Sequence, residues 1–394
     1  MKSFVYVLLL LFMHLAMASA ETLPLAEHPR PDFQRAEWQN LNGDWSFEFD
    51  ADNQGLDQRW FAGDKPFGRQ ILVPFPWGSK LSGVKDEADL AWYRRSLIVP
   101  KEWQGKRVFV VIGACDWWTT AWLDGSRLGE HKGGYTPFEF EITKKVNWGA
   151  EQDLTLRVDD TEHPFKLFGK QGYGNARGIW QTVYLEARPA LFIKSLHFTP
   201  NIDKGRVTVA ARLNDAAQEA GQFELQFKTG HVAAAVHEFK AGDAEIEFDV
   251  DIPNQHLWSL DDPFLYETDA VLKAGGEKDR VTSYFGMRKI SVVKFPGQDY
   301  TYVALNNKPI YLQLTLDQAY HPDGFYTFPS DAFMRDEILR TKRLGLNGQR
   351  IHVKIENPRK LYWADKLGVL IMADVPNSWV CPLCGATKDA FTAL

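Results

Sequence analysis

Hydrophobic and polar residues alternate with period two through the first half of the chain, which is the pattern of β-strands with one buried face. The run QTVYLEA at 181–187 alternates in this way, whereas RVFVVIGA at 107–114 is continuously apolar and predicts a fully buried strand. Asp124 and Gly125 form a turn signal of the kind that closes β-hairpins. Because helical periodicity is scarce here, residues 21–190 are predicted to form an antiparallel two-sheet sandwich of the jelly-roll type.

A second stretch of period-two strands extends from residue 191 to residue 295. It includes RVTVAARL at 206–213 and FELQFKT at 223–229, and RVTSYFGMRKISV at 280–292 is predicted as a further strand. A length of about 100 residues is typical of an immunoglobulin-like domain. The sequence therefore predicts a second sandwich, an immunoglobulin-like one, directly after the first.

After residue 295 the pattern changes to apolar strands that alternate with amphipathic helices. The run IYLQLTL at 310–316 predicts a buried strand, and a helix that Ser330 caps and Gly345 ends follows it. The next predicted strand is LNGQRIHV at 346–353.

A second helix is predicted directly after that strand. Asn357 occupies an N-cap position, Pro358 suits the first helical turn, and Gly368 is a helix terminator. The apolar run VLIMAD at 369–374 supplies a third strand. This β-α-β-α-β order predicts the beginning of a parallel sheet, which we assign to residues 296–394.

Charge and composition exclude some partners and favour others. The chain of 394 residues has a formal net charge of −6 and a pI near 6.0, and its sequence contains no lysine-rich or arginine-rich run. Nucleic acid is therefore not expected as a partner. Aromatic residues make up 13% of the chain, and their flat faces can stack on sugars as well as fill cores.

The N-terminus has the features of a secretory leader. Lys2 precedes the apolar run from Phe4 to Met17, and small residues end the segment at Ala20. We expect residues 1–20 to be a signal peptide that is cleaved after Ala20, which predicts a secreted or periplasmic protein. The run is shorter than the ~20 residues that span a bilayer, so no membrane anchor is expected.

The three cysteines do not indicate a disulfide framework or a metal site. Cys115 lies in an apolar run and is expected to be buried. Cys381 and Cys384 have the C-x-x-C spacing of a zinc knuckle, but the sequence offers no second C-x-x-C pair or paired histidines after them. No metal and no cofactor are therefore expected.

Several longer stretches resemble the family 2 glycoside hydrolases, the group of β-galactosidases, β-glucuronidases and β-mannosidases. These stretches include LNGDWSFEFD, VPFPWGSKLSGV, GNARGIWQTVYLE, SYFGMRKISV and LGLNGQRIHVKIENPRKLYWADKLGVLIMADVPNSW. The resemblance implies a jelly-roll sugar-binding domain, an immunoglobulin-like domain and a (β/α)₈ barrel, with a β-glycoside as the carbohydrate partner.

The resemblance also implies retaining hydrolysis, which needs two carboxyl groups about 5 Å apart. In the family both are glutamates at the ends of the fourth and seventh barrel strands, and the positions that match them lie beyond Leu394. Residues 296–394 are thus expected to contain the first three strands of an incomplete TIM barrel. We assign no catalytic residue, we exclude Glu356 as a helix-start residue, and we expect no hydrolysis by this chain alone.

Barrel enzymes bind their substrates at the carboxyl ends of the strands, and polar residues follow each predicted strand here. By resemblance, Arg350 supports the catalytic carboxylates and His352 hydrogen-bonds sugar hydroxyls. We therefore predict substrate binding by Arg350, His352, Asp317 and Asp374, with Gln318 and Lys354 nearby. The strand-two arginine lacks the Ser-His-Tyr-Pro string of the known β-galactosidases, so galactoside specificity does not follow.

Three functions stay open from the sequence. The first is the front part of a β-glycosidase, either truncated or one half of a split enzyme, and the second is a non-catalytic carbohydrate-binding protein. The third is a structural partner that completes another chain's barrel. The protein partner expected is either a second copy, in a homo-oligomer, or a complementing barrel fragment. Trp117 and Trp118 invite a sugar-stacking interpretation, but alternation favours core packing for at least one of them.

Overall fold

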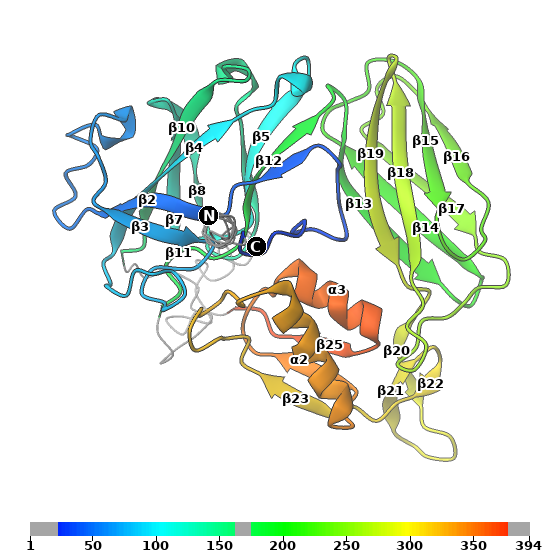
Figure 1. Cartoon of the computed structure of the whole chain (residues 1–394). Coiled ribbons are helices and arrows are strands. Elements are labelled where there is room, and N and C mark those ends of the chain that lie inside the picture. Colours follow the sequence, from blue (N-terminus) through cyan, green and yellow to red (C-terminus); the bar gives the residue numbers. More distant parts are fainter. Residues whose placement is uncertain (1–22, 162–174, 377–394) are drawn as a thin grey trace, which may run out of the picture.

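The computed structural model describes residues 23–161 and 175–376. In Figure 1 a β-sandwich lies on the left, a second sandwich on the right, and a small parallel sheet with two helices below them. The predicted leader with its cleavage site after Ala20, and the pair Cys381 and Cys384, lie outside the described residues. No helix in the described ranges is long and apolar enough to cross a membrane.

The first sandwich contains two large antiparallel sheets that enclose one core. The six-stranded sheet has the order β3 (Arg69–Val73), β2 (Gly43–Phe49), β4 (Leu90–Ile98), β10 (Glu151–Asp159), β7 (Trp118–Leu123), β8 (Ser126–Lys132). The four-stranded sheet has the order β1 (Trp38–Asn40), β12 (Val183–Arg188), β5 (Arg107–Ile112), β9 (Phe138–Glu141). A two-stranded pair and three short 3₁₀ helices complete the domain: β6 (Cys115–Asp116) with β11 (Gly178–Ile179), and Trp60–Ala62, Lys101–Trp103 and Thr143–Lys145.

The alternation read from the sequence is confirmed in this sandwich. In β12 the side chains of Val183 and Leu185 join the central core, whereas Tyr184 packs on the outer face of the sheet with Phe109 and Phe192. The hairpin between β7 and β8 turns at Asp124 and Gly125 with positive φ at both residues.

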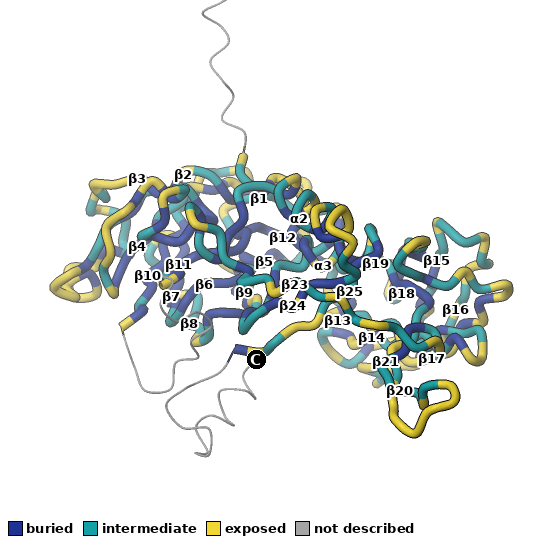
Figure 2. The backbone as a smooth tube through the Cα atoms, turned by 90° about the horizontal axis from the view of Figure 1, so that it is seen from below, coloured by how far each residue is buried: buried dark blue, intermediate teal, exposed yellow. Residues whose placement is uncertain are grey.

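In the second sandwich a three-stranded sheet packs against a four-stranded sheet, as in an immunoglobulin-like domain. The first has the order β13 (Ile193–Asn201), β14 (Arg206–Leu213), β17 (Glu245–Asp251). The second has the order β16 (Ala235–Phe239), β15 (Gly221–Phe227), β18 (Tyr266–Ala274), β19 (Glu277–Phe285). Buried residues concentrate inside each sandwich, as Figure 2 shows.

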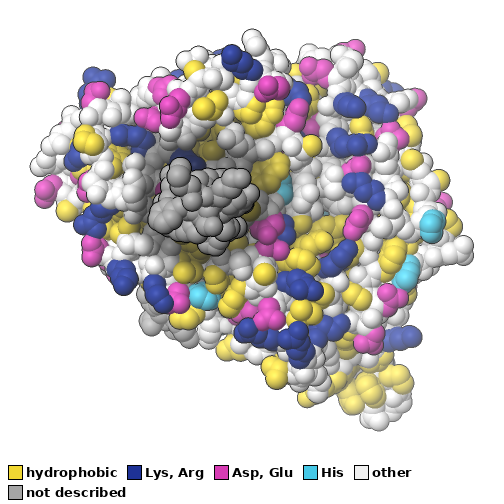
Figure 3. Space-filling view, viewed as in Figure 1, with side chains coloured by type: hydrophobic (Ala, Val, Ile, Leu, Met, Phe, Trp, Pro, Cys, Tyr) yellow, Lys and Arg dark blue, Asp and Glu magenta, His cyan; other side chains and the backbone are white. Residues whose placement is uncertain are grey.

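The run at 280–292, predicted as one strand, is divided into two elements. Strand β19 ends at Phe285, and β20 (Ile290–Lys294) joins a separate sheet with β21 (Thr301–Leu305) and β22 (Lys308–Pro309). The strand is interrupted at Gly286, where an added Cβ atom would lie 3.1 Å from Trp258. A glycine at this position lets the backbone approach Trp258 closely. This small sheet protrudes at the lower right of Figure 3 and carries hydrophobic side chains on its surface, whereas charged side chains of both signs are scattered over the rest of that face.

The predicted β-α-β-α-β order is confirmed, but the first strand is shorter than the predicted run 310–316 and is not buried, since Leu316 is 52% exposed. The parallel sheet has the order β23 (Leu314–Asp317), β24 (Gly348–Ile351), β25 (Leu370–Ala373), and the helices are α2 (Asp331–Arg343) and α3 (Pro358–Leu367). Ser330 caps α2 by accepting a hydrogen bond from the backbone of Phe333, and Asn357 caps α3 in the same way. Gly368 ends α3 at φ 74°, a left-handed conformation that favours glycine.

Candidate functional site

The carboxyl ends of the three parallel strands meet at one edge of the sheet and position the predicted site residues. Asp317 at the end of β23 is in register with Ile351 of β24, which is in register with Ala373 of β25. Arg350, His352 and Asp374 lie within one residue of these positions. Parallel strands present their carboxyl ends on the same side, so the structure brings the four predicted residues to one edge.

Arg350 and Asp374 form an ion pair on the face of the sheet that the helices do not cover. The Arg350 Nη2 atom lies 2.7 Å from Asp374 Oδ2, and Nε donates to Oδ1 at 3.3 Å. The two neighbours of Arg350 in register, Leu316 and Met372, are 52% and 44% exposed, which shows that this face is open. The guanidinium is thus available to a further anionic or hydroxyl group on the open face.

His352 lies beside Gln318, one strand away. The ring atom Nδ1 is 3.0 Å from the Gln318 side-chain oxygen, so Nδ1 carries the proton and donates when the amide has this orientation. The backbone of His352 donates to the Asp317 carbonyl at 2.9 Å and extends the pairing of β23 with β24. The imidazole and the amide together form a polar pair suited to sugar hydroxyls.

Asp317 turns toward the helices, not toward Arg350. Its Oδ2 atom accepts from Lys360 Nζ at 2.5 Å, and its Oδ1 atom accepts from the backbone of Ala319 at 2.7 Å. Burial favours the protonated form, but the charge and hydrogen bond of Lys360 outweigh it and leave the pKa of Asp317 below its ordinary value. The structure therefore separates Asp317 from the pair of Arg350 and Asp374 and gives it a structural contact.

A cluster of buried charges lies behind Asp317. Lys354 is fully buried and contacts Glu356 at 2.9 Å, while Lys360 is fully buried and contacts Glu337 at 2.9 Å and Glu356 at 3.8 Å. Burial acts to lower the pKa of Lys360, yet the carboxylates of Glu356, Asp317 and Glu337 outweigh it and raise that pKa. All these groups are engaged with one another, so the cluster is a support for the sheet edge.

Lys360 and Glu337 were not predicted from the sequence. Lys360 and Ala364 lie four residues apart on the buried face of α3. A lysine on the apolar face of a predicted helix was the sequence feature that could have indicated a buried ion pair. Glu356 precedes the Asn357 cap, as expected, and its Oε1 atom accepts from the backbone of Asn357 at 2.7 Å.

The first sandwich holds the loop between β23 and α2 in place. The Thr327 hydroxyl lies 2.7 Å from the Trp180 carbonyl and 3.0 Å from the Pro74 carbonyl, both in the sandwich. The hydroxyls of Tyr135 and Tyr326 are 3.2 Å apart across the same contact. Because this loop begins directly after Asp317, the sandwich fixes one wall of the candidate site.

The aromatic pair at the start of β7 differs from the expectation. Trp117 and Trp118 are both half-buried, so the prediction that at least one enters the core was wrong. Both lie at the end of the six-stranded sheet, where the edge strand β8 brings Lys132 to 4.0 Å from the Trp118 ring centroid.

Cys115 is buried as predicted, and burial raises the pKa of its thiol. Within residues 23–161 and 175–376 no group of three or more potential metal ligands occurs.

Comparisons with known proteins agree on one family. The family model described as "Glycosyl hydrolases family 2, sugar binding domain" matches residues 38–189, and the model described as "Glycosyl hydrolases family 2" matches residues 191–288. These ranges cover both sandwiches up to the break between β19 and β20.

Individual relatives extend the match into the parallel sheet. A β-galactosidase from Thermoanaerobacter pseudethanolicus is 27% identical over 359 residues, which cover 86% of this chain and 45% of the relative. A β-glucuronidase from Paenibacillus borealis is 26% identical over 284 residues, which cover 65% of this chain and 46% of the relative. The apo structure of a Ruminococcus gnavus β-glucuronidase superposes with a TM-score of 0.76 at 19% identity, covering 94% of this chain and 64% of the other, and supports the fold. The chain thus spans less than half the length of these two curated relatives.

Proposed function

Because the chain belongs to glycoside hydrolase family 2, we propose that it serves the hydrolysis of β-glycosides and that its parallel sheet supplies part of the substrate-binding site. The observation that carries the proposal is the edge formed by Arg350, Asp374, His352 and Gln318. A guanidinium and a carboxylate on an open face, beside an imidazole and an amide, supply donors and acceptors for sugar hydroxyls.

The two carboxyl groups of retaining hydrolysis are proposed to come from outside the described residues. In the described part of this edge each carboxylate is already engaged: Asp317 by Lys360, Asp374 by Arg350 and Glu356 by Lys354. A general acid must hold a proton near neutral pH, whereas at Asp317 the effect of burial is outweighed by Lys360, which leaves the pKa of this carboxyl below its ordinary value. These three groups are suited to binding and support, and Arg350 is placed to hold an incoming carboxylate.

A turnover assay tests this assignment. The chain alone is incubated with 4-nitrophenyl β-D-galactoside and 4-nitrophenyl β-D-glucuronide, and no release of nitrophenol above the buffer rate is expected. If the chain turns over either glycoside and Asp374→Asn abolishes that turnover, the catalytic carboxyl lies within the described edge and the proposal is wrong.

The open face of the parallel sheet favours a protein partner as well. Parallel sheets are ordinarily covered on both faces, and here the face with Leu316 and Met372 is exposed. We propose that a polypeptide carrying further barrel strands covers this face. Such a polypeptide is expected to co-purify with the chain and to give turnover that Arg350→Ala lowers at least tenfold. A homo-oligomer is the competing outcome, and sedimentation of the chain alone distinguishes it.

Export from the cytoplasm is proposed from the N-terminal sequence. The apolar run from Phe4 to Met17 and the small residues before Glu21 support cleavage after Ala20. Mass spectrometry of the protein isolated from its native source is expected to find Glu21 as the first residue. An uncleaved N-terminus would contradict the assignment.

A further inference from the structure

A cleft of about 450 Å³ lies between the two sandwiches, over the outer face of the four-stranded sheet. Its volume is in the range of roughly 300–1,000 Å³ that is usual for small-ligand sites. Its walls come from the chain before β1, from strands β5, β9 and β12 of the first sandwich, and from the beginning of β13 in the second. Its lining includes Phe33, Glu139, Tyr184, Arg188 and Lys194.

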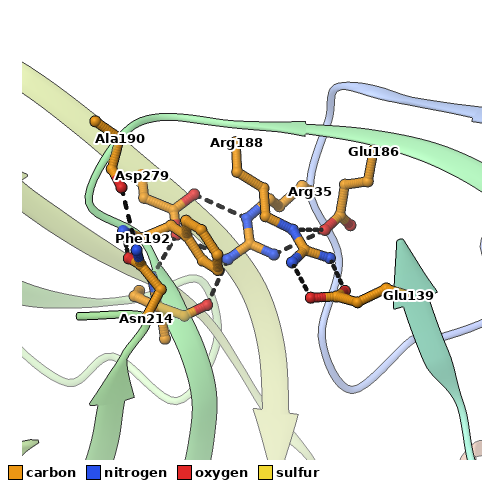
Figure 4. A network of polar contacts seen from close by, with 9 residues as sticks. Arg35, Glu139, Glu186, Arg188, Ala190, Phe192, Asn214 and Asp279 are labelled. Carbon is orange, nitrogen blue, oxygen red and sulfur yellow. Dashed lines mark hydrogen bonds and ion pairs between the residues drawn. The ribbon is translucent and has the colours of Figure 1, made fainter. Parts of the chain in front are cut away.

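The floor of the cleft is a rigid network of paired charges, shown in Figure 4. Arg188 donates to both carboxylate oxygens of Glu139 at 2.9 and 2.7 Å and to Glu186 at 2.7 Å. Arg35 donates to Glu186 at 2.9 Å and to both oxygens of Asp279 at 2.8 Å. Bidentate pairs fix the planes of both partners, so the floor holds its shape before any ligand arrives.

Two polar groups of the cleft lack a partner in the described part of the chain. Tyr184 is only 6% exposed, yet its hydroxyl makes no hydrogen bond with any residue in the described ranges. Lys194 is exposed and forms no ion pair with a described residue. The ring of Tyr184 is buried, but its hydroxyl is not among the buried polar atoms, so the hydroxyl can hydrogen-bond a group in the cleft.

The charge of the cleft favours a neutral ligand. The four cations near it, Arg30, Arg35, Arg188 and Lys194, are balanced by four carboxylates, Asp32, Glu139, Glu186 and Asp279. Burial raises the pKa of Tyr184 and Glu186 raises it further, which keeps the hydroxyl protonated as both donor and acceptor.

We propose that this cleft binds a neutral pyranoside. The Tyr184 hydroxyl and the Lys194 ammonium bind adjacent sugar hydroxyls, the outer edge of Glu139 accepts from a third, and the half-buried ring of Phe33 packs on the C–H face of the sugar. The site lies between the sandwiches and uses no residue of the parallel-sheet edge. It is therefore a second carbohydrate site and does not rest on the proposed hydrolysis.

Calorimetry on the full chain tests the site, with methyl β-D-glucopyranoside as the probe. Saturable binding in the millimolar range is expected, and Tyr184→Phe is expected to weaken it about five- to tenfold. Because this hydroxyl has no hydrogen-bond partner within residues 23–161 and 175–376, the same variant is expected to unfold at the temperature of the unmodified chain. Lys194→Ala is expected to weaken binding as well, whereas the control Tyr311→Phe, at an exposed residue in another part of the fold, changes neither property.

Three results would overturn the proposal. The first is an absence of saturable binding at concentrations of about 10 mM. The second is binding that survives Tyr184→Phe and Lys194→Ala but is lost in Arg350→Ala, which would place the sugar at the parallel-sheet edge. The third is tighter binding of D-glucuronate than of the neutral glucoside, which would show that the cleft selects an anion.

Discussion

Two buried charge networks hold this molecule together, and they are built differently. Between the sandwiches, Arg35 is buried with Asp279 and Glu186, whose side chains are 2% and 3% exposed. Behind the parallel sheet, Lys360 is buried with Asp317 and Glu337, whose side chains are 16% and 25% exposed. The two carboxylates around Arg35 are thus almost inaccessible to water although a cleft lies over the network, whereas Asp317 and Glu337 of the second network are partly hydrated.

The difference corresponds to the chemistry of the two cations. A guanidinium has five donors in a fixed plane, and Arg35 uses them on two carboxylates and on the Ile193 carbonyl at 2.6 Å. An ammonium is a point charge with three donors, and Lys360 gathers carboxylates around it without fixing their planes. We infer that the arginine network sets how the two sandwiches are placed, and that the lysine cluster stabilises the sheet edge locally.

The largest expected effect comes from Arg35→Ala. The change leaves Asp279 buried without a cation, and a buried charge stripped of its partner costs up to about 5 kcal/mol of unfolding free energy. Urea denaturation measures the loss, and the exposed control Arg212→Ala is expected to change stability by less than about 0.5 kcal/mol. Equal stabilities for the two variants would show that the network does not join the domains.

Lys360→Met should destabilise the chain less, by about 4 kcal/mol, because the carboxylates it leaves behind are partly hydrated. Its effect should also stay local. Hydrogen exchange is expected to rise in α2, α3 and the parallel strands and to remain unchanged in the sandwiches, while exposed Lys240→Met changes neither. Faster exchange throughout both sandwiches would remove the distinction between the two networks.

Local patterns in the sequence predicted helix caps and turns correctly, but they could not predict contacts between residues far apart in the sequence. The caps at Ser330 and Asn357 and the turn at Asp124 depend on residues only a few positions apart, and all three are confirmed. Arg35 and Asp279 are 244 residues apart, so no spacing rule relates them. Such an ion pair can be identified only when the positions of the two sandwiches relative to one another are known.

For the candidate site, too, the sequence predicted one part and not another. The positions of Arg350, His352, Asp317 and Asp374 at one edge follow from the order of strands and helices, which the sequence shows. The direction of each side chain does not follow, because it depends on which cations the helices bring to the edge. Lys360 turns Asp317 away from Arg350, and nothing within the β23 sequence predicts that.

Acid should act through His28 on the segment that carries Arg35 and contacts helix α3. This residue is 7% exposed, and burial lowers its pKa from 6.5 to about 4. Between these values the unfolded chain binds more protons than the folded one, so stability falls as the pH decreases and recovers as it rises. We expect His28 to account for about 2 kcal/mol of the loss between pH 7 and pH 5.

The measurement compares the slopes of stability against pH for the chain and for His28→Gln, which can still accept the hydrogen bond from the Arg30 backbone. The variant should show a flatter slope, and the exposed control His231→Gln should match the unmodified chain. The His28 carbonyl accepts from Arg359 of α3 at 2.9 Å, so the acid effect should appear in the contact between this segment and the helix. Parallel slopes for chain and variant would exclude His28 as the cause.

The smallest expected effect concerns the contact between the first sandwich and the parallel-sheet edge. Thr327→Val keeps the shape of the side chain and removes the hydroxyl that reaches the carbonyls of Trp180 and Pro74, which should cost about 1 kcal/mol. The exposed control Thr301→Val should be silent. Because the loop that holds Thr327 begins after Asp317, hydrogen exchange should rise between β23 and α2 while both charge networks keep their protection. Unchanged exchange in that loop would mean that the sandwich does not hold the site wall in place.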